Sequence, residues 1–179
     1  IKKAEAQPSL LQLLNKWLER MPFLKEGADK AFWENYKKVY TEGLADAEKG
    51  NSQVFDSIFE NPDEMPGRHL SPAACRAALF ILLYRGYPLL QLPFQLLNVL
   101  LEIDEQLSSW RYRHMNMVHR MIGTRIGTGG STGKDYLKAA ADKHYIFKEI
   151  AQLNSFLAER RKLPQLSTAL EKMLGFVAA

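Results

Sequence analysis

The sequence predicts an all-α protein. Apolar residues recur at three- and four-residue spacing in several segments, whereas no run of alternating β-branched residues predicts a strand. Prolines and glycines stand between these segments, where helices are expected to begin or end. A length of 179 residues, with 46% hydrophobic and 25% charged residues, suits one ordinary domain. We therefore expect a single helical domain over residues 1–179, without a β-sheet.

Three helices are expected in the first sixty residues. The dipeptide Pro8-Ser9 opens an amphipathic helix that stops at Pro22. A second helix is expected from about Asp29 to Lys49, with Gly50 as its C-terminal stop. A short third helix covers Ser52–Glu60.

The remaining helices follow a loop with two prolines and a glycine at 61–67. The segment Ser71–Tyr84 is apolar on nearly all sides, so we expect it deep in the core. Pro93 is expected to open the longest helix, which continues to Ile122. After a glycine-rich stretch, two more helices are expected, Asp135 to about Ala158 and Gln165–Leu174.

Composition excludes several classes of protein. The single cysteine, Cys75, rules out an intrachain disulfide framework, an all-cysteine zinc site and a cysteine-ligated iron–sulfur cluster. It indicates a reduced, cytoplasmic compartment, and the polar start Ile1–Glu5 does not resemble a secretory signal. Arginines, a glycine and prolines interrupt the apolar stretch Ala73–Leu101, so we expect no membrane span. The net charge of +4 is too small to imply nucleic-acid binding by itself.

A basic helix leading into a glycine-rich loop predicts an anion site. No acidic residue lies between Glu105 and Asp135, although five cations do. In the loop Gly127–Gly133, glycines allow backbone N–H groups to converge on an anion, either a carboxylate or a phosphate. A P-loop is excluded because five residues separate Gly127 from Gly133 and because Lys134 precedes an aspartate. The dinucleotide-binding pattern fails as well, and a solvated basic face is the plainer alternative.

The helix before this loop carries an imidazole on an apolar face. That face, which we call the His114 stripe, consists of Trp110, His114, Met117, Val118 and Met121. One interpretation is a core histidine bonded to a backbone carbonyl. The other is the single axial ligand of a haem iron, since a macrocycle needs a flat apolar wall and one nitrogen donor. Neither His119, off this face, nor the remaining histidines have the spacing of a zinc site.

These stretches closely resemble the tryptophan 2,3-dioxygenase family. The run WRYRHMNMVHRMIG over Trp110–Gly123 is followed by GTGGSTG over Gly127–Gly133 and then by Tyr136-Leu137. LPFQLL over Leu92–Leu97 and PSLL with WLER within Pro8–Arg20 are similar to the same family. The resemblance covers nearly the whole chain. It implies an all-helical haem enzyme, usually a homotetramer, that cleaves the indole C2–C3 bond of L-tryptophan with O2 to give N-formylkynurenine.

Carried over residue by residue, the resemblance assigns roles within this chain. It makes His114 the axial ligand of the iron of haem b, with one haem per protomer. The residues that it places against the haem are His114, Trp110 and Val118. Thr128 stands where the family's threonine contacts the amino-acid part of the substrate. The residues predicted to bind substrate are Thr128, Gly127 and Gly129.

The resemblance also implies that part of the active site is missing. No segment here matches the family's N-terminal half, which carries the distal histidine, the aromatic residues around the indole and the arginine that pairs with the substrate carboxylate. We therefore expect no catalytic base in this chain, which resembles the C-terminal half of the enzyme. The pocket would need the rest of the polypeptide or a partner chain.

Two other functions stay open on the sequence. One is a haem monooxygenase or hydroxylase of the same superfamily, acting on a substituted indole or another aromatic amino acid. The other is a non-enzymatic helical module whose basic helix binds an anionic partner.

Overall fold

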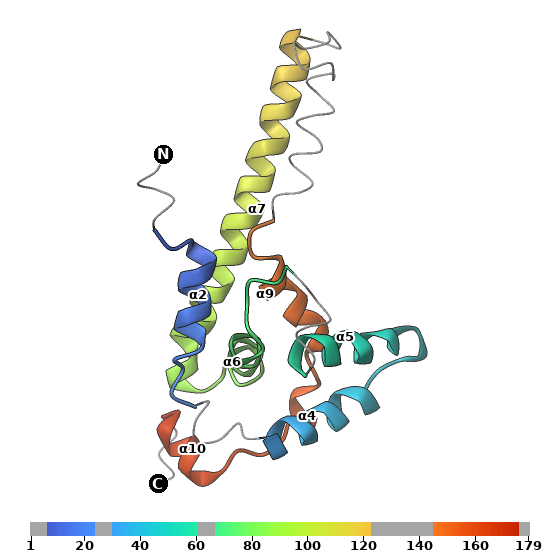
Figure 1. Cartoon of the computed structure of the whole chain (residues 1–179), viewed down its shortest axis with the longest axis vertical. Coiled ribbons are helices and arrows are strands. Elements are labelled where there is room, and N and C mark those ends of the chain that lie inside the picture. The colour runs from blue at the N-terminus through green and yellow to red at the C-terminus, as the bar shows by residue number, and fades with distance from the viewer. Residues whose placement is uncertain (1–6, 24–29, 61–66, 123–144, 176–179) are drawn as a thin grey trace. The chain divides into compact units, whose positions relative to one another are not determined.

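The computed structural model describes residues 7–23, 30–60, 67–122 and 145–175. Every regular element in these ranges is a helix, and none is a strand (Figure 1), which confirms the predicted all-α class. The chain forms two compact units, one of residues 1–97 with 149–179 and one of residues 98–148. That all 179 residues fold as one domain stays a prediction.

Helix α2 (Leu10–Leu18) begins where its sequence signal predicts. The hydroxyl of Ser9 accepts from the backbone N–H of Gln12 at 3.2 Å, and the Gln12 side chain accepts from the Ser9 N–H at 2.9 Å. This reciprocal pair satisfies two donors at the helix start. The inward side chains Leu14 and Leu18 are buried, so the cap and the apolar face fix the helix together.

The predicted second helix is wrong at its C-terminal end. Helix α4 (Lys30–Glu42) stops at Gly43, and a 3₁₀ turn, η1 (Asp46–Glu48), replaces its last part. Glycine is a poor helix former, and the Glu48 carboxylate accepts from the Ala45 N–H at 3.1 Å to start a new turn. Gly50 does not end a helix but begins α5 (Gly50–Phe59), which is otherwise the predicted third helix.

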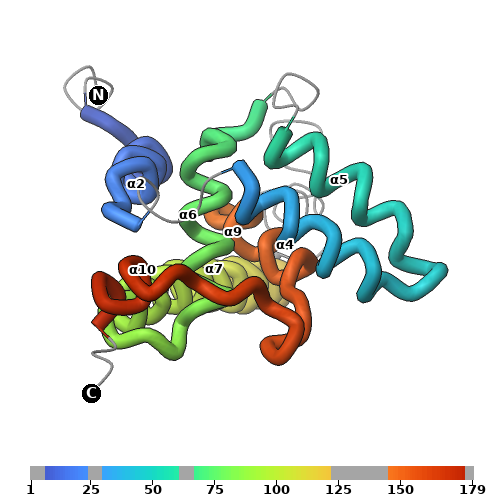
Figure 2. The backbone as a smooth tube through the Cα atoms, turned by 90° about the horizontal axis from the view of Figure 1, so that it is seen from below, coloured from blue at the N-terminus to red at the C-terminus, as the bar shows by residue number. Residues whose placement is uncertain are grey.

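Helix α6 (Pro72–Leu83) is the core of the first unit. Ser71 caps it by accepting from the Ala74 N–H at 3.2 Å, and nine of its twelve residues are buried. It packs against both α2 and α5, and Figure 2 shows it between them. The prediction that this largely apolar helix lies deep in the core is confirmed.

Buried tyrosines tie the C-terminal part of the chain to this core. The hydroxyl of Tyr36 donates to the Phe156 carbonyl, that of Tyr40 to Ser155 at 3.0 Å, and that of Tyr84 to Pro164 at 2.6 Å. Burial raises the pKa of Tyr36 well above its usual range, so its hydroxyl keeps the proton that it donates. The tyrosines thus satisfy carbonyls in a segment of short helices.

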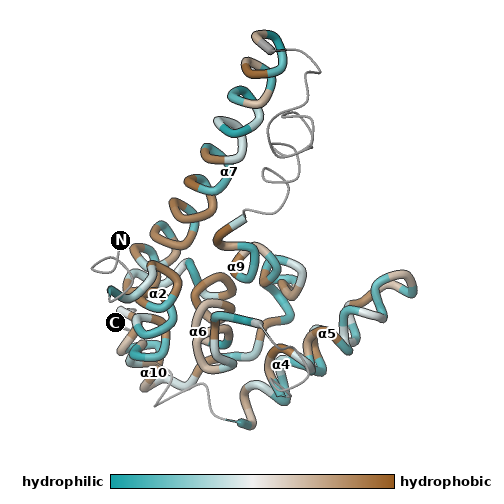
Figure 3. The backbone as a smooth tube through the Cα atoms, turned by 45° about the horizontal axis from the view of Figure 1, so that its top comes forward, coloured by the Kyte–Doolittle hydropathy of each residue, from teal (hydrophilic) through white to brown (hydrophobic). Residues whose placement is uncertain are grey.

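Helix α7 (Pro88–Ile122) has 35 residues and begins five residues before the predicted start (Figure 1). The N–H of Leu89 donates to the Leu174 carbonyl at 3.1 Å, which anchors the first turn. Pro93 lies inside the helix instead of opening it, at the loss of one backbone hydrogen bond. Figure 3 shows hydrophobic and hydrophilic residues interspersed along its whole length.

The C-terminal elements are shorter than predicted. Within the described part of the predicted 135–158 helix lie α9 (Lys148–Leu153) and the 3₁₀ turn η3 (Asn154–Phe156), while residues 135–144 lie outside it. A second 3₁₀ turn, η4 (Arg160–Lys162), follows. Helix α10 (Thr168–Met173), capped by the hydroxyl of Ser167, replaces the predicted 165–174 helix.

No single helix among the described residues is long and apolar enough to cross a membrane. Helices α6 and α7 have the length and composition of a membrane span only when taken together, as a bent pair.

A buried carboxylate holds the segment that precedes α6. Glu149 is 5% exposed and accepts from the backbone N–H groups of His69 at 2.8 Å and Leu70 at 3.0 Å. The His69 ring and the Arg68 guanidinium lie 3.1 and 3.6 Å from it. Burial by itself raises the pKa of Glu149, but these hydrogen bonds outweigh it, so the pKa falls below the ordinary 4.5.

We expect Glu149→Gln to lower the free energy of unfolding by about 1–3 kcal/mol at pH 7, because one buried acceptor is lost. Since the folded pKa is depressed, the stabilisation is present above pH 4.5 and is lost as the pH falls through the pKa of the folded state. Urea unfolding of both proteins between pH 7 and 3 should show the difference shrinking in acid. The exposed Glu34→Gln serves as the control, and a difference that grows in acid would contradict the assignment.

Candidate functional site

The His114 stripe on α7 is an apolar face with three strongly exposed side chains among the described residues. The side chains of Trp110, Met117 and Met121 are 61%, 52% and 76% exposed, and His114 and Val118 are half-buried. A histidine in a packed core would lie among buried neighbours. Exposed large apolar side chains in one row instead indicate a surface that receives another group.

The imidazole of His114 is held against its aromatic neighbour. The rings of Trp110 and His114 stack with their centroids 5.5 Å apart and an interplanar angle of 11°. The two residues are four apart in α7, so the helix itself brings them together. Stacking restricts rotation of the imidazole, which helps to present one nitrogen in a fixed direction.

The protein ligands near this face suit a metal ion whose other ligands come from a cofactor. Within the described ranges, no three His, Cys, Asp or Glu side chains gather in a way that could hold a metal ion. A zinc site needs several protein ligands, whereas a porphyrin supplies four nitrogens of its own and takes one from the protein. A single imidazole beside exposed apolar side chains therefore offers what a haem requires of the protein.

The same helix carries a second imidazole that the sequence analysis set aside. His119 is half-buried, and its Nδ1 is buried without a hydrogen-bond partner among the described residues. It lies five residues beyond His114, which places it on a different side of the helix. The structure thus keeps the two histidines in separate surroundings, as their spacing predicts.

The predicted basic region is only partly described. Arg113 and Arg120 are exposed on α7 and lie seven residues apart, hence on one side of the helix. Arg111 is half-buried. Arg125 and Lys134 lie outside the described residues, as do the predicted substrate-binding residues Thr128, Gly127 and Gly129.

Asp104, a carboxylate that sequence reasoning missed, fixes the segment that leads into α9. Asp104 is 3% exposed, and its two oxygens accept from the backbone N–H groups of Ile146 at 3.0 Å and Phe147 at 2.6 Å. It lies on α7 ten residues before His114. Its neighbourhood in the sequence, Glu102-Ile103-Asp104-Glu105, holds three acidic residues, so the sequence by itself does not single it out. The helix that bears His114 is thereby tied to the segment that enters α9.

Fold and site together define a class: an all-helical protein with one imidazole on an exposed apolar face that suits a planar macrocycle. The family model described as tryptophan 2,3-dioxygenase matches residues 44–157. A tryptophan 2,3-dioxygenase of Alteromonas mediterranea is 39% identical over 98% of this chain and 56% of its own length. Those of Bdellovibrio bacteriovorus and Dictyostelium discoideum are 38% and 36% identical, over 95% and 98% of this chain and 54% and 50% of their own lengths.

The chain belongs to the tryptophan 2,3-dioxygenase family. It spans about half the length of the curated relatives that it matches.

We expect Asp104→Ala to release the entry to α9. Two backbone donors lose their buried acceptor, which should cost about 1–3 kcal/mol of unfolding free energy. Hydrogen–deuterium exchange should accelerate at the amides of Ile146 and Phe147 before it does in α6. The adjacent, exposed Glu105→Ala is the matched control. Unchanged exchange at these two amides would contradict the role given to Asp104.

Proposed function

We propose that this chain is part of a haem-dependent dioxygenase that cleaves the indole C2–C3 bond of L-tryptophan with O2, giving N-formylkynurenine. The observation that carries the proposal is the exposed His114 stripe in a member of the tryptophan 2,3-dioxygenase family. Relatives that bear this name are 35–39% identical to it. This reaction is the first step of tryptophan catabolism by the kynurenine route, and we assign the protein to the cytoplasm.

His114 is the residue proposed to hold the cofactor, and its imidazole would bind the iron of a haem b, one per protomer. When bound, the haem supplies the iron at which dioxygen is activated. The imidazole must be neutral at the nitrogen that binds iron, and the stack with Trp110 helps to hold that nitrogen in one direction. Val118, one turn further along α7, extends the apolar wall. Arg113 and Arg120 offer cations on the same helix for the haem propionates.

The glycine-rich loop is the proposed clamp for the amino-acid part of the substrate. Thr128 provides a hydroxyl, and Gly127 and Gly129 allow backbone N–H groups to approach a carboxylate closely. Asp104 supports the role of the loop as a clamp, because it fixes Ile146 and Phe147 ahead of α9. Holding the zwitterion brings the indole double bond to the oxidant, which is an effect of proximity and orientation.

We assign no catalytic base to this chain. We propose that the distal side of the pocket comes from the family's N-terminal half or from a partner chain, and that the assembly is a homotetramer. The length of the relatives supports the first of these two proposals, since the chain spans 56%, 54% and 50% of the first three.

Replacement of His114 tests the haem assignment directly. We expect His114→Ala to lose stoichiometric haem and the normal Soret band, because the iron loses its only protein ligand, and added imidazole to restore the band in part. His119→Ala removes an imidazole from the same helix and should keep both. A normal haem spectrum in the position-114 variant would refute the assignment.

Product analysis tests the reaction. In 18O2 the assembled enzyme should convert L-tryptophan to N-formylkynurenine that carries two labelled oxygen atoms, as mass spectrometry measures. Incorporation of a single labelled atom into an intact indole would instead indicate a monooxygenase.

A further inference from the structure

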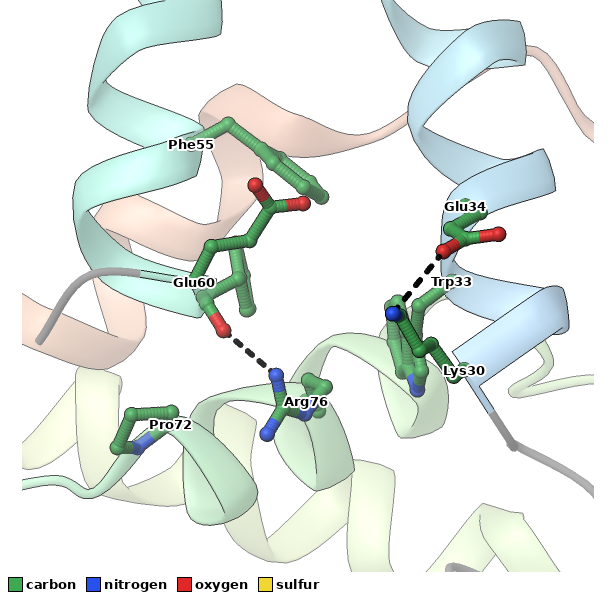
Figure 4. Close-up of a pocket in the computed structure, with 8 residues that line it drawn as sticks. Lys30, Trp33, Glu34, Phe55, Glu60, Pro72 and Arg76 are labelled. Carbon is green, nitrogen blue, oxygen red and sulfur yellow. Dashed lines mark hydrogen bonds and ion pairs between the residues drawn. The ribbon is translucent and has the colours of Figure 1, made fainter.

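A cleft that the proposed haem chemistry does not use lies within the first unit. It has a volume of about 760 Å³, and side chains of α4, α5 and α6 line it (Figure 4). Cavities of roughly 300–1,000 Å³ are typical of small-molecule sites. Its aromatic lining residues are Trp33, Phe55 and Phe59. The other lining residues are Pro72 and the charged Lys30, Glu34, Glu60 and Arg76.

The aromatic wall of the cleft favours a flat ligand. The rings of Trp33 and Phe59 are nearly parallel, with centroids 6.2 Å apart and an interplanar angle of 13°. Phe55 packs on Phe59 with ring centroids 4.4 Å apart, which extends the aromatic wall. A planar aromatic ring gains both burial and ring–ring contact on such a surface.

Among the described residues, Arg76 is the cation of the cleft without a carboxylate partner. Lys30 pairs with Glu34 at 3.7 Å, and Glu60 accepts from Lys37 at 3.2 Å. Arg76 instead donates one N–H to the carbonyl of Phe59 at 2.6 Å, and no carboxylate of the described residues lies within ion-pair distance of it.

The guanidinium of Arg76 is therefore held in place and still has N–H groups to which an anion can bind. Its hydrogen bond to the Phe59 carbonyl holds the guanidinium in the cleft, where Figure 4 shows it together with Trp33 and Phe55. Burial lowers the pKa of Arg76, against the opposing effects of Cys75 and Glu60, which reflects the cost of keeping this charge away from water. A carboxylate matches the remaining N–H groups and offsets that cost.

We propose that this cleft binds a small planar aromatic carboxylate. Its carboxylate accepts hydrogen bonds from Arg76, and its ring lies against Trp33 and Phe59. Aromatic acids without an amine and aromatic amino acids share this chemistry. The carboxylates of Glu34 and Glu60 at the same cleft would favour the ammonium group of the second kind.

Calorimetric titration of the protein as isolated tests the proposal. 2-Naphthoate should bind, whereas its neutral isostere 2-naphthamide should bind at least tenfold more weakly, because it brings no charge to Arg76. Arg76→Gln should weaken 2-naphthoate binding at least tenfold, while Arg161→Gln, at an exposed arginine, should leave it unchanged. Comparison of the affinities for 2-naphthoate and naphthylalanine then shows whether the cleft prefers an aromatic acid without an amine or an aromatic amino acid.

The acid–amide comparison needs no variant, so it decides the matter even if Arg76→Gln does not fold. Equal affinity for acid and amide, or unchanged affinity in Arg76→Gln, would overturn the proposal. Binding lost in His114→Ala but kept in Arg76→Gln would place the acid at the haem face and would overturn it too. Failure of the dioxygenase assignment leaves these results unaffected.

Discussion

A carboxylate buried in a helical protein must find hydrogen-bond donors for its oxygens, because its charge has lost the water that solvated it. Helix interiors offer none, since their N–H groups are already bonded, so the donors come from chain segments between helices. Asp104 takes two from Ile146 and Phe147, and Glu149 takes two from His69 and Leu70. The connections into α9 and into α6 are held in this way, each within its own unit.

Helices α6 and α7 use apolar residues in opposite ways. In α6 they surround the helix, and the aromatic residues of the first unit close over them; Phe80, for example, stacks on Phe23 at 4.7 Å. In α7 the His114 stripe stays open although it carries a tryptophan and two methionines. Burying these exposed apolar side chains is favourable, so it can contribute to the binding of a group from outside the described residues.

Local sequence signals predicted the capped helix starts after Ser9 and Ser71 well, but the helix boundaries near Gly50 and Pro93 poorly. Ser9 and Ser71 begin their helices because a hydroxyl satisfies N–H groups within three residues, an interaction that needs no distant partner. The predictions at Gly50 and Pro93 were wrong because glycine and proline can each stand at more than one position in or beside a helix. Gly50 begins α5, and Pro93 is tolerated inside α7, whose first turn is anchored by the Leu174 carbonyl from the far end of the chain.

By itself, the sequence determined the helical class, the buried character of α6 and the row of residues around His114, because all three follow from helical periodicity. It also determined the resemblance to a dioxygenase family. Only the tertiary structure decided that the His114 stripe is exposed, that Asp104 is a buried anchor, and that Arg76 and Trp33 share a cleft. How helices pack decides which side chains are buried and which residues distant in sequence come into contact. The spacing of residues along the sequence does not specify that packing.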